Sequence, residues 1–471
     1  MGTRLIEGSR RQRLEVLIAG GGVAALEAML ALRKLAADRV SIKLLAPDPE
    51  FVYRPLSVAE PFALGEPRRH GLAGIARAQG AHYRRDALAG VDSDRKLVRT
   101  ASGTELSYGA LLLAFGARRL QALPGTLTFR GSEDVEAFRD VLVALERREA
   151  RRVAFAVPSE ALWPLPIYEL ALLTAAHLAA RGVDEAELEV VTHEPRPLGV
   201  FGRRASDRVR TLLGDAGVGL RTSTVPVHAE EDRLILEKGE PMLADRVVAM
   251  PRLEVPDIPG IPQGRRGFIP TDSEGRIEAN DRVYAAGDAT WFPLKQGGLA
   301  AQQADAAAAA IARVAGADVP PQPFRPVLRG ALLTGSAPEY LRDEPDDREA
   351  TSVAARGALW WPPSKIAGRY LAPYLAARGD EQAMAKLEDI EAPHREELEA
   401  VELDHREAVE IALTAADADA RWHDYRAALR WLEVAEQLNL TLPPAFATKR
   451  RRWTRELAGE QRSGRKRISP S

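Results

Sequence analysis

Three glycines open the most specific motif of the chain, residues 20–25, which read Gly-Gly-Gly-Val-Ala-Ala. The motif stands between an apolar, strand-like run and a helix-like run. In this G-x-G-x-x-A pattern Gly20 permits a tight turn, Gly22 lets the backbone approach a pyrophosphate, and Ala25 allows close packing of helix on strand. The free N–H groups at the start of the helix favour an anion. The pattern predicts a dinucleotide site; the alternative is a glycine turn that merely links strand and helix.

A carboxylate is expected about 20 residues after such a motif, where it binds ribose hydroxyls. The second apolar run ends at Ala46, and the acidic residues Asp48 and Glu50 follow it. The ribose is therefore predicted to be held by one of these loop carboxylates, Asp48 being the nearer, or by backbone groups. The pyrophosphate site does not depend on this choice.

A further carboxylate stands after another apolar run, which ends at Gly287 and Asp288. The carboxyl end of a strand is where α/β sheets bind ligands, so Asp288 either holds a ligand or only caps its turn. A helix is predicted from near Gly298, and its positive end, with Gly298 and Leu299, would face the same ligand. Lys295 either adds a positive charge there or is an exposed loop lysine.

The composition narrows the chemistry. The chain has 471 residues, of which 45% are hydrophobic and 28% are charged, which excludes a disordered or collagen-like protein. The formal net charge of -2 makes nucleic acid an unexpected partner. The sequence has no cysteine, which excludes disulfides, thiolate nucleophiles and ordinary iron–sulfur clusters. Redox chemistry would therefore need a bound cofactor, and the histidines show no metal-ligand spacing.

Three stretches resemble motifs of one family of flavoproteins. The strand-like stretch that ends in Ala114 and Gly116 resembles “YDxLLLATG”. The stretch that contains Asp288 resembles “VYAxGD”, whose aspartate holds the FAD ribityl chain in that family. The loop that contains Arg54 and Pro55 resembles the “F-x-x-x-PL” loop beside the flavin.

Together these motifs resemble the pyridine nucleotide-disulfide oxidoreductase superfamily, and within it sulfide:quinone reductases and type II NADH dehydrogenases. The resemblance covers residues 12–335. It implies an α/β fold with two dinucleotide-binding, Rossmann-like domains, the FAD domain being split by the second one, and non-covalently held FAD. A C-terminal helical appendage follows. The FAD domain is predicted to consist of residues 12–130 and 266–318, and the second dinucleotide-type domain of residues 131–265. An interface region over residues 319–375 and the appendage with its basic tail, residues 376–471, follow.

The second domain departs from the pattern that binds NADH. Residues 158–167 contain three prolines and Trp163 but no glycine, so the backbone is poorly suited to approach a pyrophosphate. Glu194, at the end of the next strand, still offers a carboxylate to an adenine ribose, so NAD(P)H is predicted to bind weakly. Residues 194–202 resemble the sulfide:quinone reductases. Their sulfide oxidation passes through cysteines, which this chain lacks, and is therefore excluded.

Glu169 is the predicted group for proton chemistry. The string around it resembles “V-E-L-A” of type II NADH dehydrogenases, which places a glutamate near the flavin. In so apolar a stretch the pKa of Glu169 should rise, which suits a proton relay during flavin or quinone reduction. The alternative is a glutamate at a helix start, favoured there by the macrodipole and without chemistry.

The last third of the chain carries aromatic and basic groups. Trp360 and Trp361, close to Lys365, are typical of a membrane interface, a dimer contact or a lid over the flavin. The appendage is predicted to contain amphipathic helices that pack on the body, on a second copy or on a protein partner. The basic run 449–452 is predicted as a solvated, frayed terminus or as a surface for anionic lipid or nucleic acid. With no signal peptide or span predicted, the expected location is the cytoplasm, with or without peripheral membrane contact.

The functional prediction is an FAD-dependent oxidoreductase that passes electrons from a reductant, NAD(P)H included, to a quinone or a similar acceptor. The catalytic groups would be Glu169 and Lys295. The alternative from a different class is a degenerate flavin-binding scaffold that recruits a partner through its C-terminal helices. The absent glycine loop and the absent cysteines favour the scaffold, whereas the intact flavin helix and Glu169 favour the enzyme.

Overall fold

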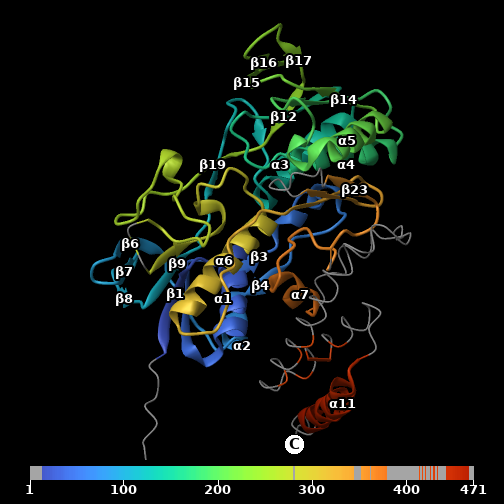
Figure 1. The fold of residues 1–471 in the computed structure, drawn as a ribbon. Helices are drawn as coiled ribbons and strands as arrows, with labels where there is room; N and C mark the ends of the chain where they lie inside the picture. Colours follow the sequence, from blue (N-terminus) through green and yellow to red (C-terminus); the bar gives the residue numbers. More distant parts are fainter. Residues whose placement is uncertain are drawn as a thin grey trace, which may run out of the picture.

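The computed structural model describes most of the chain between Arg13 and Arg465. The described positions are 13–278, 280, 282–343, 352–360, 362–378, 413, 416, 420, 425, 428, 429, 432 and 442–465. Within them the chain forms two parallel sheets with helices on their faces, followed by a small antiparallel sheet and C-terminal helices (Figure 1). This confirms the predicted fold class.

The first sheet is parallel, and its strand order places the glycine motif at its centre. The order is β20 (Val283–Ala285), β9 (Ala110–Leu113), β1 (Leu14–Ala19), β2 (Val40–Ala46) and β5 (His82–Arg85). Within β1 the residues from Val16 to Ala19 form one apolar run, because both faces of the strand are buried there. Val16 and Ile18 face α1 (Val23–Ala36) and α6 (Gly297–Val314), which lie side by side in Figure 1.

The opposite face of this sheet is covered by a three-stranded antiparallel sheet. Leu17 of β1 shares a buried apolar cluster with Val91 and Val98 of that sheet. Its strands are β6 (Leu88–Asp92), β7 (Leu97–Thr100) and β8 (Glu105–Ser107). The remaining short elements of this part of the chain are β3 (Glu50–Val52), β4 (Arg69–Gly71) and α2 (Leu72–Ala78).

The second parallel sheet is formed by residues that lie between β9 and β20 in the sequence. Its order is β11 (Leu127–Thr128), β18 (Arg246–Ala249), β12 (Arg152–Val157), β13 (Glu187–Thr192) and β14 (Val218–Arg221). Helices α3 (Val135–Glu146), α4 (Leu165–Ala179) and α5 (Gly202–Asp215) pack with it, and a hairpin sheet of β15 (Pro226–Glu230), β16 (Arg233–Leu236) and β17 (Met242–Leu243) follows β14. The first domain is therefore split by the second, as predicted; the exact boundaries stay a prediction.

Two short strands carry the chain from one domain to the other. β10 (Arg118–Leu120) leaves the first domain and pairs in antiparallel fashion with β19 (Arg252–Glu254), which returns to it. The two crossings therefore lie next to each other.

After α6 the chain forms an antiparallel sheet of β21 (Leu328–Leu332), β22 (Glu339–Asp343) and β23 (Val353–Ala355), which packs against α4 and α5. Trp360 then lies in the core, with 3% of its surface exposed and its ring 5.2 Å from that of Tyr340. Of the three roles predicted for Trp360, this burial argues against a membrane interface. Trp361 lies outside the described residues.

The basic run 449–452 belongs to α11 (Pro444–Arg465), so it forms a helix and is not frayed, although Arg451 and Arg452 are exposed to solvent as predicted. Residues 466–467, which belong to the same predicted basic tail, lie outside the described residues. The helix is anchored by Trp453, which is 1% exposed in the apolar cluster that also contains Tyr374 and Leu375 of α7 (Leu371–Ala376). Within the described ranges, no helix has both the length and the apolar character that a membrane crossing requires.

We expect Arg208→Met to lower the free energy of unfolding by about 2 kcal/mol, because Arg208 of α5 donates two hydrogen bonds to Glu339 of β22. Glu339 is 3% exposed and would be left as a buried, unpaired carboxylate. The measurement is chemical denaturation. Arg203→Met, at an exposed position of the same helix, is the control and should change stability little; equal effects of both variants would contradict this account.

Candidate functional site

A cavity of about 1170 Å³ lies where residues from both parallel sheets and from the C-terminal region meet. Its size is slightly above the range of about 300–1,000 Å³ typical of small-molecule sites, which suits a ligand as large as a dinucleotide. The start of α1 and the residues that follow β9 and β20 form one part of its wall. The cavity therefore lies at the carboxyl ends of the strands of the first sheet, where the sequence predicts that a ligand binds.

The start of α1 is built to approach a ligand closely. Gly20 has φ +141°, and a Cβ there would lie 2.1 Å from the carbonyl oxygen of Ala114, so only glycine fits. A Cβ on Gly22 would meet nothing within 4 Å. Gly22 caps α1 without a side-chain hydrogen bond, so the first N–H groups of the helix stay available to an anion. Ala25 does not line the cavity; it is fully buried, in agreement with its predicted packing role.

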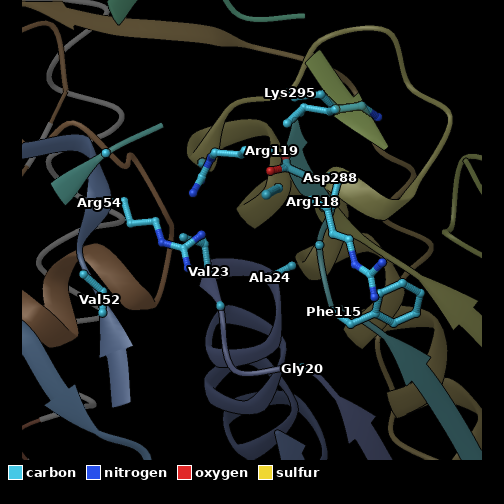
Figure 2. A pocket seen from close by; sticks show the side chains of 18 of the residues that line it. Gly20, Val23, Ala24, Val52, Arg54, Phe115, Arg118, Arg119, Asp288 and Lys295 are labelled. Carbon is cyan, nitrogen blue, oxygen red and sulfur yellow. The ribbon is translucent and has the colours of Figure 1, made fainter. Parts of the chain in front are cut away.

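Two arginines extend over the start of α1. Arg54 and Arg119 line the cavity, and Figure 2 shows their guanidinium groups approaching each other near Val23. Neither group makes a hydrogen bond or ion pair with the described residues. Burial lowers the pKa of Arg119, and the charge of Arg54 lowers it further, while Asp288 opposes both. Asp288 and Glu133 offset this repulsion only in part, and no carboxylate of the described residues is bonded to either cation, so a bound anion would stabilise both. Sequence reasoning missed Arg119, whose only signal is its place just after Gly116.

Asp288 stands at the end of β20 and lines the cavity. The turn that carries it is fixed by Gln303 of α6, whose Oε1 accepts a hydrogen bond of 2.8 Å from the Gly287 N–H. The hydroxyl of Thr290 donates to the Gly287 carbonyl at 2.9 Å. With the turn held by these groups, the carboxylate of Asp288 is left available to a ligand. Gln303 was not predicted as a site residue.

Lys295 is not an exposed loop lysine, since only 6% of it is accessible. Its Nζ donates to the carbonyl of Thr290 and lies 4.4 Å from the centre of the Phe268 ring. Burial lowers its pKa to about 8, and Asp288 acts in the opposite direction. Lys295 lines the cavity, but its amine is already bound by the protein.

The start of α6 meets the cavity at a different point from the one predicted. Gln296 and Gly297 line the cavity, whereas Gly298 and Leu299 do not. The Oε1 atom of Gln296 caps the helix by accepting from the Leu299 N–H at 3.0 Å, and its Nε2 donates to the carbonyl of Arg329 at 2.5 Å. The N–H of Leu299 is therefore already bonded within the protein.

Glu169 is the buried acid of the cavity wall. Its Oε1 atom accepts from the Nζ of Lys365 and from the Leu333 N–H, the latter at 2.9 Å. Its Oε2 atom is buried and has no hydrogen-bond partner among the described residues. Burial raises the pKa of Glu169, an effect that Lys365 reduces, and burial lowers the pKa of Lys365. Lys365 was assigned by its sequence context to an aromatic and basic patch, not to this site.

The carboxylate predicted to hold a nucleotide in the second domain is already bound by the protein. Glu194 accepts hydrogen bonds at its Oε2 atom from the hydroxyls of Tyr168, at 2.7 Å, and Thr192, at 3.0 Å. Only 8% of Glu194 is exposed, so the expectation that it offers a carboxylate to a ribose is not supported by this geometry. Trp163 packs edge-on against Phe201, with 5.7 Å between the ring centres, and fills the region before α4.

The structure thus gathers eleven of the fourteen predicted site residues on one cavity; Ala25, Gly298 and Leu299 lie off it. Asp48 lines its outer part, and its carbonyl accepts from the hydroxyl of Tyr83 at 2.7 Å. The predicted residues on the cavity wall are Gly20, Gly22, Asp48, Arg54, Pro55, Ala114, Gly116, Glu169, Gly287, Asp288 and Lys295.

Comparisons with known proteins point to one class of fold. Residues 169–311 match the model of the family described as pyridine nucleotide-disulphide oxidoreductase. The chain is similar to the sulfide:quinone oxidoreductase of the hyperthermophilic bacterium Aquifex aeolicus, with 18% identity, 73% of this chain and 87% of that chain covered, and a TM-score of 0.66. A ferredoxin reductase from Rhodopseudomonas palustris has 22% identity, coverages of 70% and 81%, and a TM-score of 0.52.

An NAD-dependent persulfide reductase from A. fulgidus has 18% identity, coverages of 70% and 64%, and a TM-score of 0.51. A comparison with curated proteins finds no match. At these identities the solved structures show what fold the chain has.

We expect Glu194→Ala to reduce stability by about 1–3 kcal/mol, because the buried hydroxyl of Tyr168 loses its acceptor. The measurement is unfolding in urea, and Glu187→Ala, at the exposed start of β13, the strand that precedes Glu194, is the control. If Glu194 instead served a nucleotide, the variant would keep its stability and lose nucleotide affinity.

Proposed function

We propose that this chain, which has the fold and, over residues 169–311, the sequence signature of the pyridine nucleotide-disulphide oxidoreductase superfamily, is an FAD-dependent oxidoreductase that delivers electrons to a quinone or a similar acceptor. The observation that carries the proposal is the cavity that joins a dinucleotide-type helix start to the buried acid Glu169.

The residues of the first domain suit FAD. The free N–H groups at the start of α1, together with Arg54 and Arg119, would bind its two phosphates. Asp288 would bind hydroxyls of the ribityl chain, as in the family motif it resembles, and Gly20 and Gly22 leave room for the approach. Bound FAD supplies two-electron redox chemistry, which the side chains of a cysteine-free chain do not provide.

Glu169 and Lys365 would supply the proton side of the reaction. Reduction of a quinone to a quinol takes two electrons and two protons; a hydride from reduced FAD would bring both electrons with one of the protons, and Glu169 would supply the other. Glu169 retains its proton to higher pH than an exposed glutamate because burial raises its pKa. When the proton is on the unpartnered Oε2 atom, that O–H group would donate to a quinone oxygen, and Lys365 would stabilise the carboxylate that remains after proton transfer. The apolar side chains of Trp163, Leu165 and Ile366 on the same wall suit a hydrophobic ring.

NAD(P)H is the least favoured of the electron donors. Glu194 is engaged by Tyr168 and Thr192, and the turn before α4 carries Pro164 at the cap position. A pyrophosphate needs several backbone N–H groups, and proline has none. We therefore propose weak binding of NAD(P)H and a donor that reaches the cavity by another path.

A flavin-binding scaffold that recruits a partner is the second candidate. This candidate is favoured by the second domain, where Glu194 is engaged and the turn before α4 contains proline. It is also favoured by the C-terminal helix α11, whose exposed face carries Arg451, Arg452 and Arg455. A scaffold would hold FAD without rapid electron transfer.

We expect the purified protein to be yellow and to release FAD on denaturation. Arg119→Ala should weaken FAD binding at least about tenfold, since it removes one of the two unpaired cations beside α1, and the residual affinity should depend less on salt. Equilibrium dialysis at two ionic strengths measures both effects. Arg95→Ala, whose side chain is 63% exposed, is the control. A protein that stays colourless after incubation with FAD would overturn the proposal.

We expect Glu169→Gln to slow the reoxidation of the bound FAD by a quinone at least about 100-fold, because the amide cannot donate a proton. In the wild type the rate should fall as pH rises through the raised pKa of Glu169, and the variant should lose this fall. Stopped-flow absorbance measures the rate after photoreduction, with Glu105→Gln as the surface control.

Mixing the protein with NADH, NADPH and quinols in parallel experiments tests the electron donor. Saturation at low micromolar NADH would refute weak binding of NAD(P)H. No reaction with any of these compounds or with quinone would favour the scaffold.

A further inference from the structure

The carboxylate of Glu27, on helix α1, does not face the cavity. Glu27 belongs to α1, is completely buried and lies between the apolar neighbours Leu26 and Ala28. A buried carboxylate costs free energy unless its oxygens are hydrogen-bonded. An apolar side chain would fill such a core position at lower cost, so the bonds that Glu27 makes are informative.

Glu27 binds the backbone at the start of α7, which lies next to α1 (Figure 1). Its Oε1 atom accepts from the Tyr370 N–H and its Oε2 atom from the Leu371 N–H, both at 2.7 Å. A Cβ on Gly368 would lie 2.6 Å from Oε2, so a residue larger than glycine would displace the segment or the carboxylate. The two carboxylate oxygens of Glu27 therefore bind two successive N–H groups, and Gly368 leaves the space that Oε2 occupies.

A second acid faces Glu27 from the neighbouring helix. The side chain of Asp305, on α6, is hydrogen-bonded to Glu27, and the chain that leads into α7 contributes the backbone N–H groups of Arg369, Tyr370 and Leu371. Burial raises the pKa of Glu27 to about 7. Two carboxyl groups in this arrangement can share one proton, which reduces the charge that is buried.

Residues 365–371, here called the strap, run from the second domain to α1. At one end Lys365 binds Glu169 of α4. Beside it the Ile366 N–H donates to the hydroxyl of Tyr53 at 3.0 Å, and Ile366 lines the cavity. At the other end the strap is bound by Glu27. Its position therefore depends on both domains at once.

We propose that Glu27 is a positioning residue, which holds the strap so that Lys365 meets Glu169 on the cavity wall. The structural part of this inference stands alone, and its consequence for turnover rests on the proposed function. Glu27 acts through the backbone of the strap and touches neither the cavity nor its ligand.

Glu27→Gln tests the structural part. A glutamine has one acceptor oxygen, so its NH₂ group would face the N–H of Leu371, and one bond of the strap is lost. Lys365 is 9% exposed, and we expect the variant to increase its rate of acetylation by an N-hydroxysuccinimide ester at least tenfold. Peptide mass spectrometry on the full chain gives this rate. Asp38→Asn, at a residue whose side chain is 93% exposed, is the control and should leave Lys365 protected.

Gly368→Ala approaches the same contact from the strap. Its Cβ should displace Oε2 of Glu27 and give the same increase in Lys365 acetylation. Because both substitutions act on one contact, the double variant should be no more reactive than the stronger single variant. Gly368→Ala also provides the result if Glu27→Gln does not fold. Unchanged acetylation of Lys365 in folded variants would overturn the proposal.

The functional part is read from flavin reoxidation by a quinone. Withdrawal of Lys365 from Glu169 removes a charge that lowers the pKa of Glu169, so the apparent pKa of the rate should move to higher pH in both variants while FAD content stays unchanged. A merely structural role of Glu27 would lower thermal stability without moving this pKa, and that outcome would also overturn the proposal. If wild-type protein does not react with quinones, the proposed function fails, whereas the acetylation of Lys365 still decides whether Glu27 holds the strap.

Discussion

The ion pair between Glu169 and Lys365 is the interaction on which the arrangement of this molecule depends. Neither ion can be buried alone, because the loss of hydration would cost several kcal/mol for each of them. Each is therefore bound to a partner that comes from a distant part of the chain, Glu169 from α4 and Lys365 from the segment before α7. The Leu333 N–H, which follows β21, completes the arrangement. The pair thus brings the second domain, the antiparallel sheet and the strap to one point on the wall of the cavity.

The cavity has two parts with different chemistry. At the start of α1 the wall is cationic and backbone-rich, which suits phosphate groups, and Gly20 is fitted to the carbonyl of Ala114. Around Glu169 the wall is apolar, with Trp163 and Leu165 in place of the glycine loop of a second nucleotide site. The first domain thus offers groups that suit a phosphate, while the corresponding place in the second domain forms part of the wall of the shared cavity.

The sequence predicts those features that arise from local chain geometry. The turn at Gly20 and Gly22, the strand that ends at Gly116 and the carboxylate of Asp288 are each set by a few neighbouring residues, and their places at the ligand edge follow from the topology of a parallel sheet. The acid Glu169 is recognisable for the same reason, since a carboxylate in a long apolar helix stands out.

Several residues were missed or misread because their side-chain or backbone partners cannot be recognised from the sequence. Lys365 lies 196 positions from Glu169, and its neighbours in the sequence gave no sign of this partner. Lys295 was predicted to face the ligand, but its amine binds the carbonyl of Thr290, and Leu299 is bound to the side chain of Gln296. For the basic run 449–452, charge suggested fraying, whereas the burial of Trp453 one residue later holds the helix. For Lys365 and the basic run a tertiary contact outweighed the local pattern, whereas Lys295 and Leu299 are bound by groups within five residues, in turns whose geometry the residue types do not reveal.

The pairing of β10 with β19 bears on how such a molecule can evolve. The chain leaves the first domain and returns to it through two neighbouring strands, whose backbones are about 5 Å apart in a sheet. The second domain is thus an insertion with closely spaced ends, the arrangement in which a module can be exchanged or remodelled without disturbing its host. Substitutions that removed the nucleotide loop of the inserted module would leave the strand order of the host sheet intact. In a chain built this way, one half can change its ligand while the other half keeps its own.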